Sequence, residues 1–334
     1  MTDFVFRVTG LCNKRCGTCC CRDPRSVLLP ESFRKKAREI FEFSDKRGES
    51  AVICFTGGEP FLYRAPDERG RRWDIVNLVT ATRRWLPNAL VVLKTSGWTP
   101  HKVLDRFLDA IESPVSDTTV DVRLGFNLYQ NDGADAEDRL EHMIVSVLKY
   151  QRTMRIDTIY DLRNLSATLE LFDRVLWRLG GPATRLADMM TAPERGWRFT
   201  IPVRFVPFKP NHHFGAERRI LLDTMPAHPG LEGTPSKDFI EAEVGPSCPT
   251  IQSGPNVIMY EPDLSFHHCN DAFADYSFSA FSSSQIQCVD EQFAFLEERF
   301  ALLKDHLKES NISFSHRRER CIYCTRFLHR LSTG

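Results

Sequence analysis

The chain has 334 residues, enough for one large core and a small appended unit, so we expect one or two domains. Lys plus Arg and Asp plus Glu number 44 each, and the resulting net charge of zero argues against a protein whose main task is to bind a nucleic-acid backbone. The sequence shows no secretory signal and no apolar stretch of membrane-spanning length, so we expect a cytoplasmic protein with no membrane partner.

Short apolar runs alternate with longer helical patterns through the first two thirds of the chain. The runs are typical of buried strands, and the segments between them have the apolar spacing of helices. Repeated strand–helix units predict an α/β fold with a parallel sheet, either a partial (β/α)6 barrel or an open wound sheet. Both architectures place functional residues at the carboxyl ends of the strands. The predicted strands are residues 4–8, 51–55, 90–94, 120–126, 156–160 and 199–205, and the predicted helices are residues 31–43, 73–85, 101–111, 136–150 and 165–179.

The pattern changes after residue 207. Residues 208–247 are rich in Pro, Gly, His and charged residues, which is typical of a long loop or lid. Residues 257–266 then predict a hairpin, and a helix with one apolar face follows it. We therefore predict a first domain over residues 1–207 and a smaller C-terminal domain over residues 208–334.

Five of the eleven cysteines fall within residues 12–21. In a reducing compartment such a cluster favours metal binding over disulfides. Cys12, Cys16 and Cys19 form a CxxxCxxC motif directly after the first predicted strand. Three thiolates can hold three irons of a four-iron cluster and leave the fourth open, as a catalytic site requires. The alternatives are packing cysteines or a zinc site, and Cys20 is a possible replacement for Cys19 as the third ligand.

A second motif follows the second predicted strand, which lies beside the first in a parallel sheet. Gly57 and Gly58 allow the backbone to approach a ligand closely. Glu59, followed by Pro60, can form a charge-assisted bond with an ammonium group. Alone this GGEP sequence would be an ordinary Gly-Gly turn. Together, in this order and on adjacent strands, the two motifs are specific.

Through these two motifs the chain resembles the radical S-adenosylmethionine superfamily over roughly its first 205 residues. The resemblance implies that the three cysteines hold a [4Fe-4S] cluster whose open iron is chelated by the amino and carboxylate groups of S-adenosylmethionine. It implies that Gly57, Gly58 and Glu59 hold the amino group. Reductive cleavage then gives a 5′-deoxyadenosyl radical that takes hydrogen from the substrate, with a reducing partner such as flavodoxin or ferredoxin.

Three further positions bear on this resemblance. Ser96, in the segment after the third strand, is similar to a ribose-contacting position, and Asn164 after the fifth strand is similar to a cofactor-facing position. For each, a plain turn or a helix cap is the alternative. The sequence departs from the family pattern at Thr18, where an aromatic residue is usual.

The remaining cysteines form a second set in the predicted C-terminal domain. Their order is one cysteine, a hairpin, a second cysteine, a long helical gap and then CxxC. This layout resembles the twitch domain, a shortened SPASM extension, which implies a fully ligated auxiliary [4Fe-4S] cluster. A closed structural zinc site is the alternative. The four residues are Cys248, Cys269, Cys321 and Cys324, and Cys288 is left as a packing residue or spare thiol.

The resemblance to twitch enzymes implies radical chemistry on a small polar metabolite, with dehydrogenation in a biosynthetic pathway as one form. Modification of a ribosomally made peptide is the alternative, disfavoured because little chain precedes the first strand. A noncatalytic metal-binding protein is the third hypothesis. The candidate bases for the substrate proton are Arg204 and Tyr129. Asp121, Arg123 and Asn127 are polar residues in a buried-looking strand, where structural ion pairs compete with substrate contacts.

Overall fold

The structure is a computed structural model, and the described residues are 1–13, 23–112, 120–128, 133–160, 163–190, 197–204, 218–228, 231–235, 248, 254–268, 286, 288–310, 312, 314 and 317–330. In these residues one ten-stranded sheet has the order β10–β9–β7–β6–β5–β2–β1–β11–β12, with β8 paired to β9. The strands are β1 (Thr2–Thr9), β2 (Ala51–Gly57), β5 (Leu90–Thr95), β6 (Val120–Gly125), β7 (Thr153–Tyr160), β8 (Trp197–Val203), β9 (Arg218–His228), β10 (Leu231–Pro235), β11 (Val257–Tyr260) and β12 (Phe266–His267).

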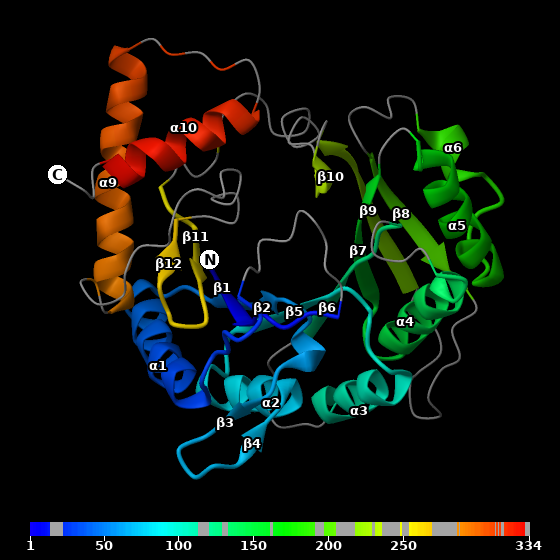
Figure 1. Ribbon diagram of the computed structural model, residues 1–334, viewed down its shortest axis with the longest axis horizontal. Coiled ribbons are helices and arrows are strands. Elements are labelled where there is room, and N and C mark those ends of the chain that lie inside the picture. Colours follow the sequence, from blue (N-terminus) through cyan, green and yellow to red (C-terminus); the bar gives the residue numbers. More distant parts are fainter. Residues whose placement is uncertain are drawn as a thin grey trace.

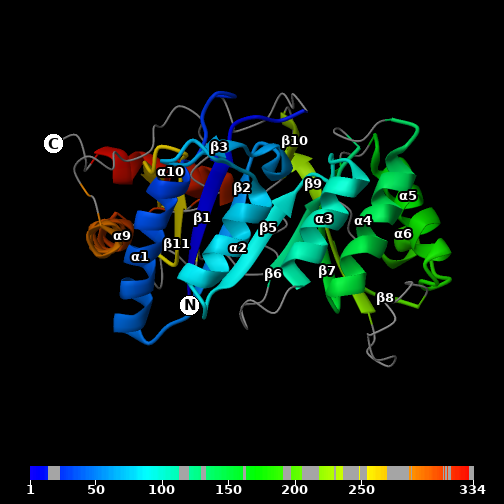
Figure 2. The same cartoon turned by 90° about the horizontal axis from the view of Figure 1, so that it is seen from below.

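Helices cover the outer face of this curved sheet (Figure 1). They are α1 (Pro30–Arg47), α2 (Ile75–Trp85), α3 (His101–Glu112), α4 (Ala136–Tyr150), α5 (Leu165–Arg178) and α6 (Leu186–Met189), while α9 (Val289–Glu309) and α10 (Arg317–Arg330) lie beside the β11–β12 end. From below, α1 to α4 stand in front of the strands (Figure 2). The predicted α/β class with a mostly parallel sheet is confirmed, and no pairing within the described strands closes the sheet into a barrel.

Local sequence signals explain where several helices begin and end. Pro30 occupies the first turn of α1, where a missing N–H has no cost, and Gly48 ends that helix with a φ of 62°. A reciprocal capping box starts α2 at Asp74. Cys288 caps α9 in the same way, with its Sγ accepting from the backbone N–H of Glu291 at 3.5 Å. In its described contacts Cys288 therefore serves as the N-cap of α9.

The sixth strand was placed wrongly from the sequence. The run at residues 199–205 corresponds to β8, which pairs antiparallel with β9. The sixth parallel strand beside β7 is β9, which lies inside the segment predicted to be a lid. Its residues alternate between buried Ile220 and Leu222 on one face and Arg219 and Asp223 on the other, so charged side chains obscured a strand pattern.

The predicted hairpin is present and continues the main sheet. β11 and β12 pair antiparallel, with Tyr260 opposite Phe266. β11 also pairs in parallel with β1, where Phe6 lies opposite Tyr260. Strands from both sides of residue 207 therefore share one sheet, and the division into two domains at that residue stays a prediction.

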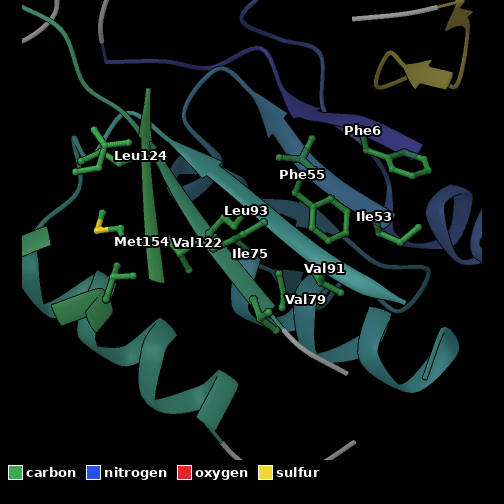
Figure 3. Close-up of a cluster of buried hydrophobic side chains, with 14 of the residues drawn as sticks. Phe6, Ile53, Phe55, Ile75, Val79, Val91, Leu93, Val122, Leu124 and Met154 are labelled. Carbon is green, nitrogen blue, oxygen red and sulfur yellow. The ribbon is translucent and has the colours of Figure 1, made fainter. Parts of the chain in front are cut away.

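The sheet separates two apolar clusters. The larger lies between the strands and the outer helices, and Figure 3 shows Phe55, Leu93 and Val122 facing Ile75 and Val79 of α2. The smaller lies on the inner face and consists of Val5, Val52, Cys54, Val92 and Met259. Cys54 is 5% exposed and belongs to this smaller cluster. None of the described helices has the length and apolar character required to cross a bilayer.

Candidate active site

The carboxyl ends of the parallel strands form one aligned edge. The pairing registers place Thr9 opposite Gly57, Thr95 opposite Leu124, Leu124 opposite Ile156, and Ile156 opposite Leu222. In the β2–β5 pairing Phe55 lies opposite Leu93, so Gly57 and Thr95 are level as well. The first cysteine motif, the GGEP turn and the Thr95-Ser96-Gly97 segment therefore all begin at the same height of the sheet.

The start of the cysteine loop binds directly to the GGEP turn. The N–H of Gly58 donates to the carbonyl oxygen of Thr9 at 2.6 Å, and the N–H of Glu59 donates to that of Leu11 at 2.9 Å. The N–H of Leu11 donates in turn to the Thr9 hydroxyl at 3.1 Å. Main-chain bonds thus fix the backbone that leads into Cys12.

The paired glycines make room for this contact. Gly57 has a φ of 128°, and a Cβ there would lie 2.6 Å from the Thr9 carbonyl oxygen. A Cβ on Gly58 would lie 2.1 Å from the Leu11 carbonyl oxygen. The sequence predicted close approach of a ligand, whereas the close approach in the described residues is that of the chain's own cysteine loop.

Glu59 is completely enclosed and joins two strand ends. Its Oε1 accepts from the Thr95 hydroxyl at 2.7 Å and the Phe61 N–H at 3.2 Å. Its Oε2 accepts from the Ser96 hydroxyl at 2.5 Å and the Ser96 N–H at 3.0 Å. Burial raises the pKa of Glu59, and the bonds from Ser96, Thr95 and Phe61 oppose that rise. The carboxyl group holds the two turns together, and Pro60 begins the buried one-turn helix η1 (Pro60–Leu62) behind it.

Cys12 is partly exposed beyond β1, beside a contact that sequence reasoning missed. Its Sγ lies 4.0 Å from Oδ1 of Asn13, and the Asn13 amide donates to the carbonyl oxygen of Trp98 at 3.0 Å. The Arg139 guanidinium of α4 lies 3.8 Å from the Trp98 ring centroid, a cation–π distance. The position of Trp98 directly after Thr95-Ser96-Gly97 was its one sequence signal. Cys16, Thr18, Cys19, Cys20 and Cys21 lie outside the described residues.

Two further predicted site residues, Asn164 and Arg204, lie at different edges of the sheet. Asn164 occupies the position before α5 without a side-chain capping bond. Arg204 follows the antiparallel strand β8, whose end pairs with the first residue of β9, so Arg204 lies at the opposite edge of the sheet from Gly57. The assignment of residues 199–205 as a sixth parallel strand is wrong, and the role of Arg204 as a candidate base stays a prediction. Tyr129 lies outside the described residues.

Charged side chains occupy the rest of the inner face, across β6, β7, β9 and β8. Asp223 is buried, and its two carboxylate oxygens contact Arg155 at 2.6 Å and Arg198 at 2.5 Å. Arg155 also contacts Asp157 at 3.4 Å. Asp157 and Asp223 are opposite each other in the register, one residue beyond the row that contains Thr95. On β6, Asp121 and Arg123 form the ion pair that the sequence allowed, at 2.7 Å, while Asn127 is buried.

The second cysteine set is described only in part. Cys248 is partly exposed, and Cys324 on α10 is 8% exposed. Cys269 and the side chain of Cys321 lie outside the described residues. Burial lowers the pKa of His329 on α10, and the nearby His267 lowers it further. In the ribbon view α10 lies beside the β11–β12 hairpin (Figure 1). Within the described residues no three His, Cys, Asp or Glu side chains gather as a metal site.

Comparisons with known proteins give distant likenesses. No protein-family model matches the chain, and no curated protein matches it. Among solved structures it is similar to anSMEcpe with bound AdoMet, at 14% identity and a TM-score of 0.38 over 52% of this chain and 48% of that one. It is also similar to native anSMEcpe with bound AdoMet and Cp18Cys peptide, at 12% identity and a TM-score of 0.38 over 52% of this chain and 47% of that one. A third similar structure is BtrN in complex with AdoMet and 2-DOIA, at 13% identity and a TM-score of 0.41 over 92% of this chain and 87% of that one. The chain thus spans about half the length of anSMEcpe, and TM-scores at this level do not establish a shared fold.

Proposed function

We propose that this protein is a radical S-adenosylmethionine enzyme that acts on a small polar metabolite. The observation that carries the proposal is the contact between the two motifs, in which Gly58 and Glu59 bind the carbonyl oxygens of Thr9 and Leu11 at the carboxyl edge of the sheet. Two segments far apart in the sequence are thereby built into one site, at the edge where parallel α/β proteins bind their ligands.

In this proposal Cys12, Cys16 and Cys19 hold a [4Fe-4S] cluster. The described donor fits, because Cys12 offers a soft, partly exposed thiol at a strand end. With S-adenosylmethionine bound, the cluster supplies one-electron cleavage to a 5′-deoxyadenosyl radical that removes hydrogen from the substrate. Glu59 acts as a positioning residue, because its enclosed carboxyl group holds Thr95 and Ser96. A flavodoxin or ferredoxin is the proposed electron donor.

The charges of the inner face support a small polar substrate. Arg155 and Arg198 are 38% and 47% exposed, and Asp157 is 28% exposed, while Asp223 between them is buried. Guanidinium groups fixed by a buried carboxylate present donors in a set geometry, and Asp157 adds an acceptor. Two cations and two anions leave this group of four without net charge. It suits hydroxyl, amino and carboxylate groups better than it suits an apolar ligand.

The second cysteine set is assigned to an auxiliary [4Fe-4S] cluster, which would accept an electron if the reaction is a dehydrogenation. In support, Cys324 lies on α10, Cys269 follows the β11–β12 hairpin in the sequence, and α10 lies beside that hairpin (Figure 1). A zinc site with the same four cysteines would not accept an electron, so the metal identity decides whether a net oxidation is available to this protein.

Metal content and S-adenosylmethionine cleavage test the proposal. After anaerobic reconstitution we expect about eight irons per chain in the wild type and about four in a variant with Cys12, Cys16 and Cys19 replaced by Ala. With dithionite, only the wild type should release 5′-deoxyadenosine, measured by liquid chromatography with mass detection. About four irons per chain in the wild type and none in the variant would exclude the auxiliary cluster. No 5′-deoxyadenosine from iron-loaded wild type would establish the noncatalytic hypothesis.

The size of the substrate needs a separate measurement. A low-molecular-weight filtrate of a cell extract should raise 5′-deoxyadenosine formation above that without substrate. Arg155→Gln should lose most of this increase, because Arg155 belongs to the inner face, whereas Arg178→Gln on the outer helix α5 should keep it. An increase found only with the retained peptide fraction would favour the peptide alternative.

A further inference from the structure

A buried charged cluster joins β1 to the β11–β12 hairpin. Nη1 of Arg7 donates to Oε1 of Glu261 at 2.8 Å, and Nε2 of His267 lies 3.0 Å from the same oxygen. The side chains of Arg7, Glu261 and His267 are 6%, 23% and 8% exposed. Charges are seldom placed this deep in a protein unless their position matters, because desolvation offsets most of their attraction.

The cluster lies between two segments that lead, along the chain, to one cysteine of each set. Arg7 precedes Cys12 by five residues on the strand that leads into the first motif, and His267 precedes Cys269 by two. β1 and β11 run side by side up to the pair Phe6–Tyr260, so Arg7 and Glu261 continue that register. The three side chains therefore connect the backbone entering one set with the backbone entering the other.

The attachment of β11 to β1 does not depend on these charges. On the outer face the rings of Phe6 and Tyr260 stack with centroids 4.8 Å apart, and both residues are fully buried. The Tyr260 hydroxyl donates to Gln292 of α9 at 2.6 Å. Apolar contact of this kind supplies stability, whereas a buried ion pair contributes mainly to the choice of one geometry.

We infer that Arg7, Glu261 and His267 are positioning residues that fix the hairpin end carrying Cys269 relative to the strand leading to Cys12. The inference rests on the proposed function, in which both cysteine sets bind iron. In this role the three residues act through the backbone that bears the cysteine ligands.

The test compares variants of Arg7 with a matched control. Arg7→Met removes the guanidinium partner of Glu261 and should lower Tm by about 5–10 °C, while the double variant Arg7→Met/Glu261→Met should return to within about 2 °C of the wild type. Arg7→Lys should retain the pairing. The control is Lys36→Met, since Lys36 is also a buried cation, paired with Glu39 and 5.6 Å from the Tyr260 ring on the opposite face of β11.

Two readouts separate positioning from folding. Hydrogen exchange of the metal-free chain should be at least about 10-fold faster in peptides covering residues 257–268 of the double variant, and unchanged in the control. Iron in the double variant should fall from about eight to about four per chain, with 5′-deoxyadenosine formation retained. Arg7→Lys, which retains the pairing, should keep the hydrogen exchange and the iron content of the wild type.

A double variant that folds, exchanges like the wild type and keeps its iron overturns the inference. Wild type with only about four irons would instead contradict the auxiliary-cluster part of the proposed function. In that case the hydrogen exchange of the hairpin still decides whether Arg7 and Glu261 position it.

Discussion

Gly58→Ala is the sharpest test of how the first site is built. The added Cβ would lie 2.1 Å from the Leu11 carbonyl oxygen and 2.6 Å from its carbon, where ordinary contact begins at 3.4 Å. The obstacle is backbone, so Leu11 must move by about 1 Å and its bond from the Glu59 N–H must break. Overpacking of about 1–3 kcal/mol plus a lost hydrogen bond of about 1 kcal/mol gives about 2–4 kcal/mol.

This destabilisation acts on the segment that leads into Cys12. If the cysteine loop moves away, Tm changes little, and if the fold resists, Tm falls by about 5–10 °C. In either case iron at the first motif should drop from about four per chain to below about one, measured by iron and sulfide analysis after reconstitution. The control is Gly70→Ala, where φ is 73° and no atom lies within 4 Å, so only backbone strain of about 1 kcal/mol is added. Full iron in Gly58→Ala would refute the argument that the loop rests on this glycine.

Three further predictions concern buried groups. Burial raises the pKa of Glu59 above 4.5, so its contribution to stability is full below that pH and is lost as pH rises through the raised pKa. The stability advantage of wild type over Glu59→Gln, measured as a Tm difference, should therefore shrink as pH rises above 4.5, and a pH-independent difference would contradict this. Burial likewise raises the pKa of Cys54, so iodoacetamide should label this thiol only in urea, as read by mass spectrometry. Asp223→Asn should cost about 3 kcal/mol in urea unfolding, because Arg155 and Arg198 lose a buried anion, whereas Asp121→Asn should cost less.

The sequence was sufficient for the strands that form short, continuous apolar runs. The strands at residues 51–55 and 90–94 are apolar on both faces and were recognised directly. β9 was missed because its inner face bears Arg219 and Asp223, which gave it the composition of a loop. The direction of β8 could not be predicted either, because strand direction depends on pairing and not on the composition of the strand itself.

For the candidate site, the motifs identified residues more reliably than their contacts. Glu59 was expected to bind a ligand ammonium, but its described partners are Thr95, Ser96 and Phe61. Thr95 and Ser96 are distant in sequence and become partners only because β5 lies next to β2 in the sheet. Pairing between strands is a tertiary property, so a local pattern could locate the carboxylate without indicating what it holds.

The enclosure of Glu59 also changes how substitutions near the first motif should be interpreted. Cys12 reaches the sheet through Thr9 and Leu11, these carbonyls bind the turn at Gly58 and Glu59, and Glu59 binds the end of β5. The first link consists of two hydrogen bonds and the second of three, while the large apolar cluster beneath β2 and β5 is independent of them. Local openings involve the least buried and least connected parts first. A change in this path therefore acts on the placement of the cysteine loop before it acts on the fold, so loss of iron with an intact Tm would indicate a displaced loop and need not mean a lost ligand.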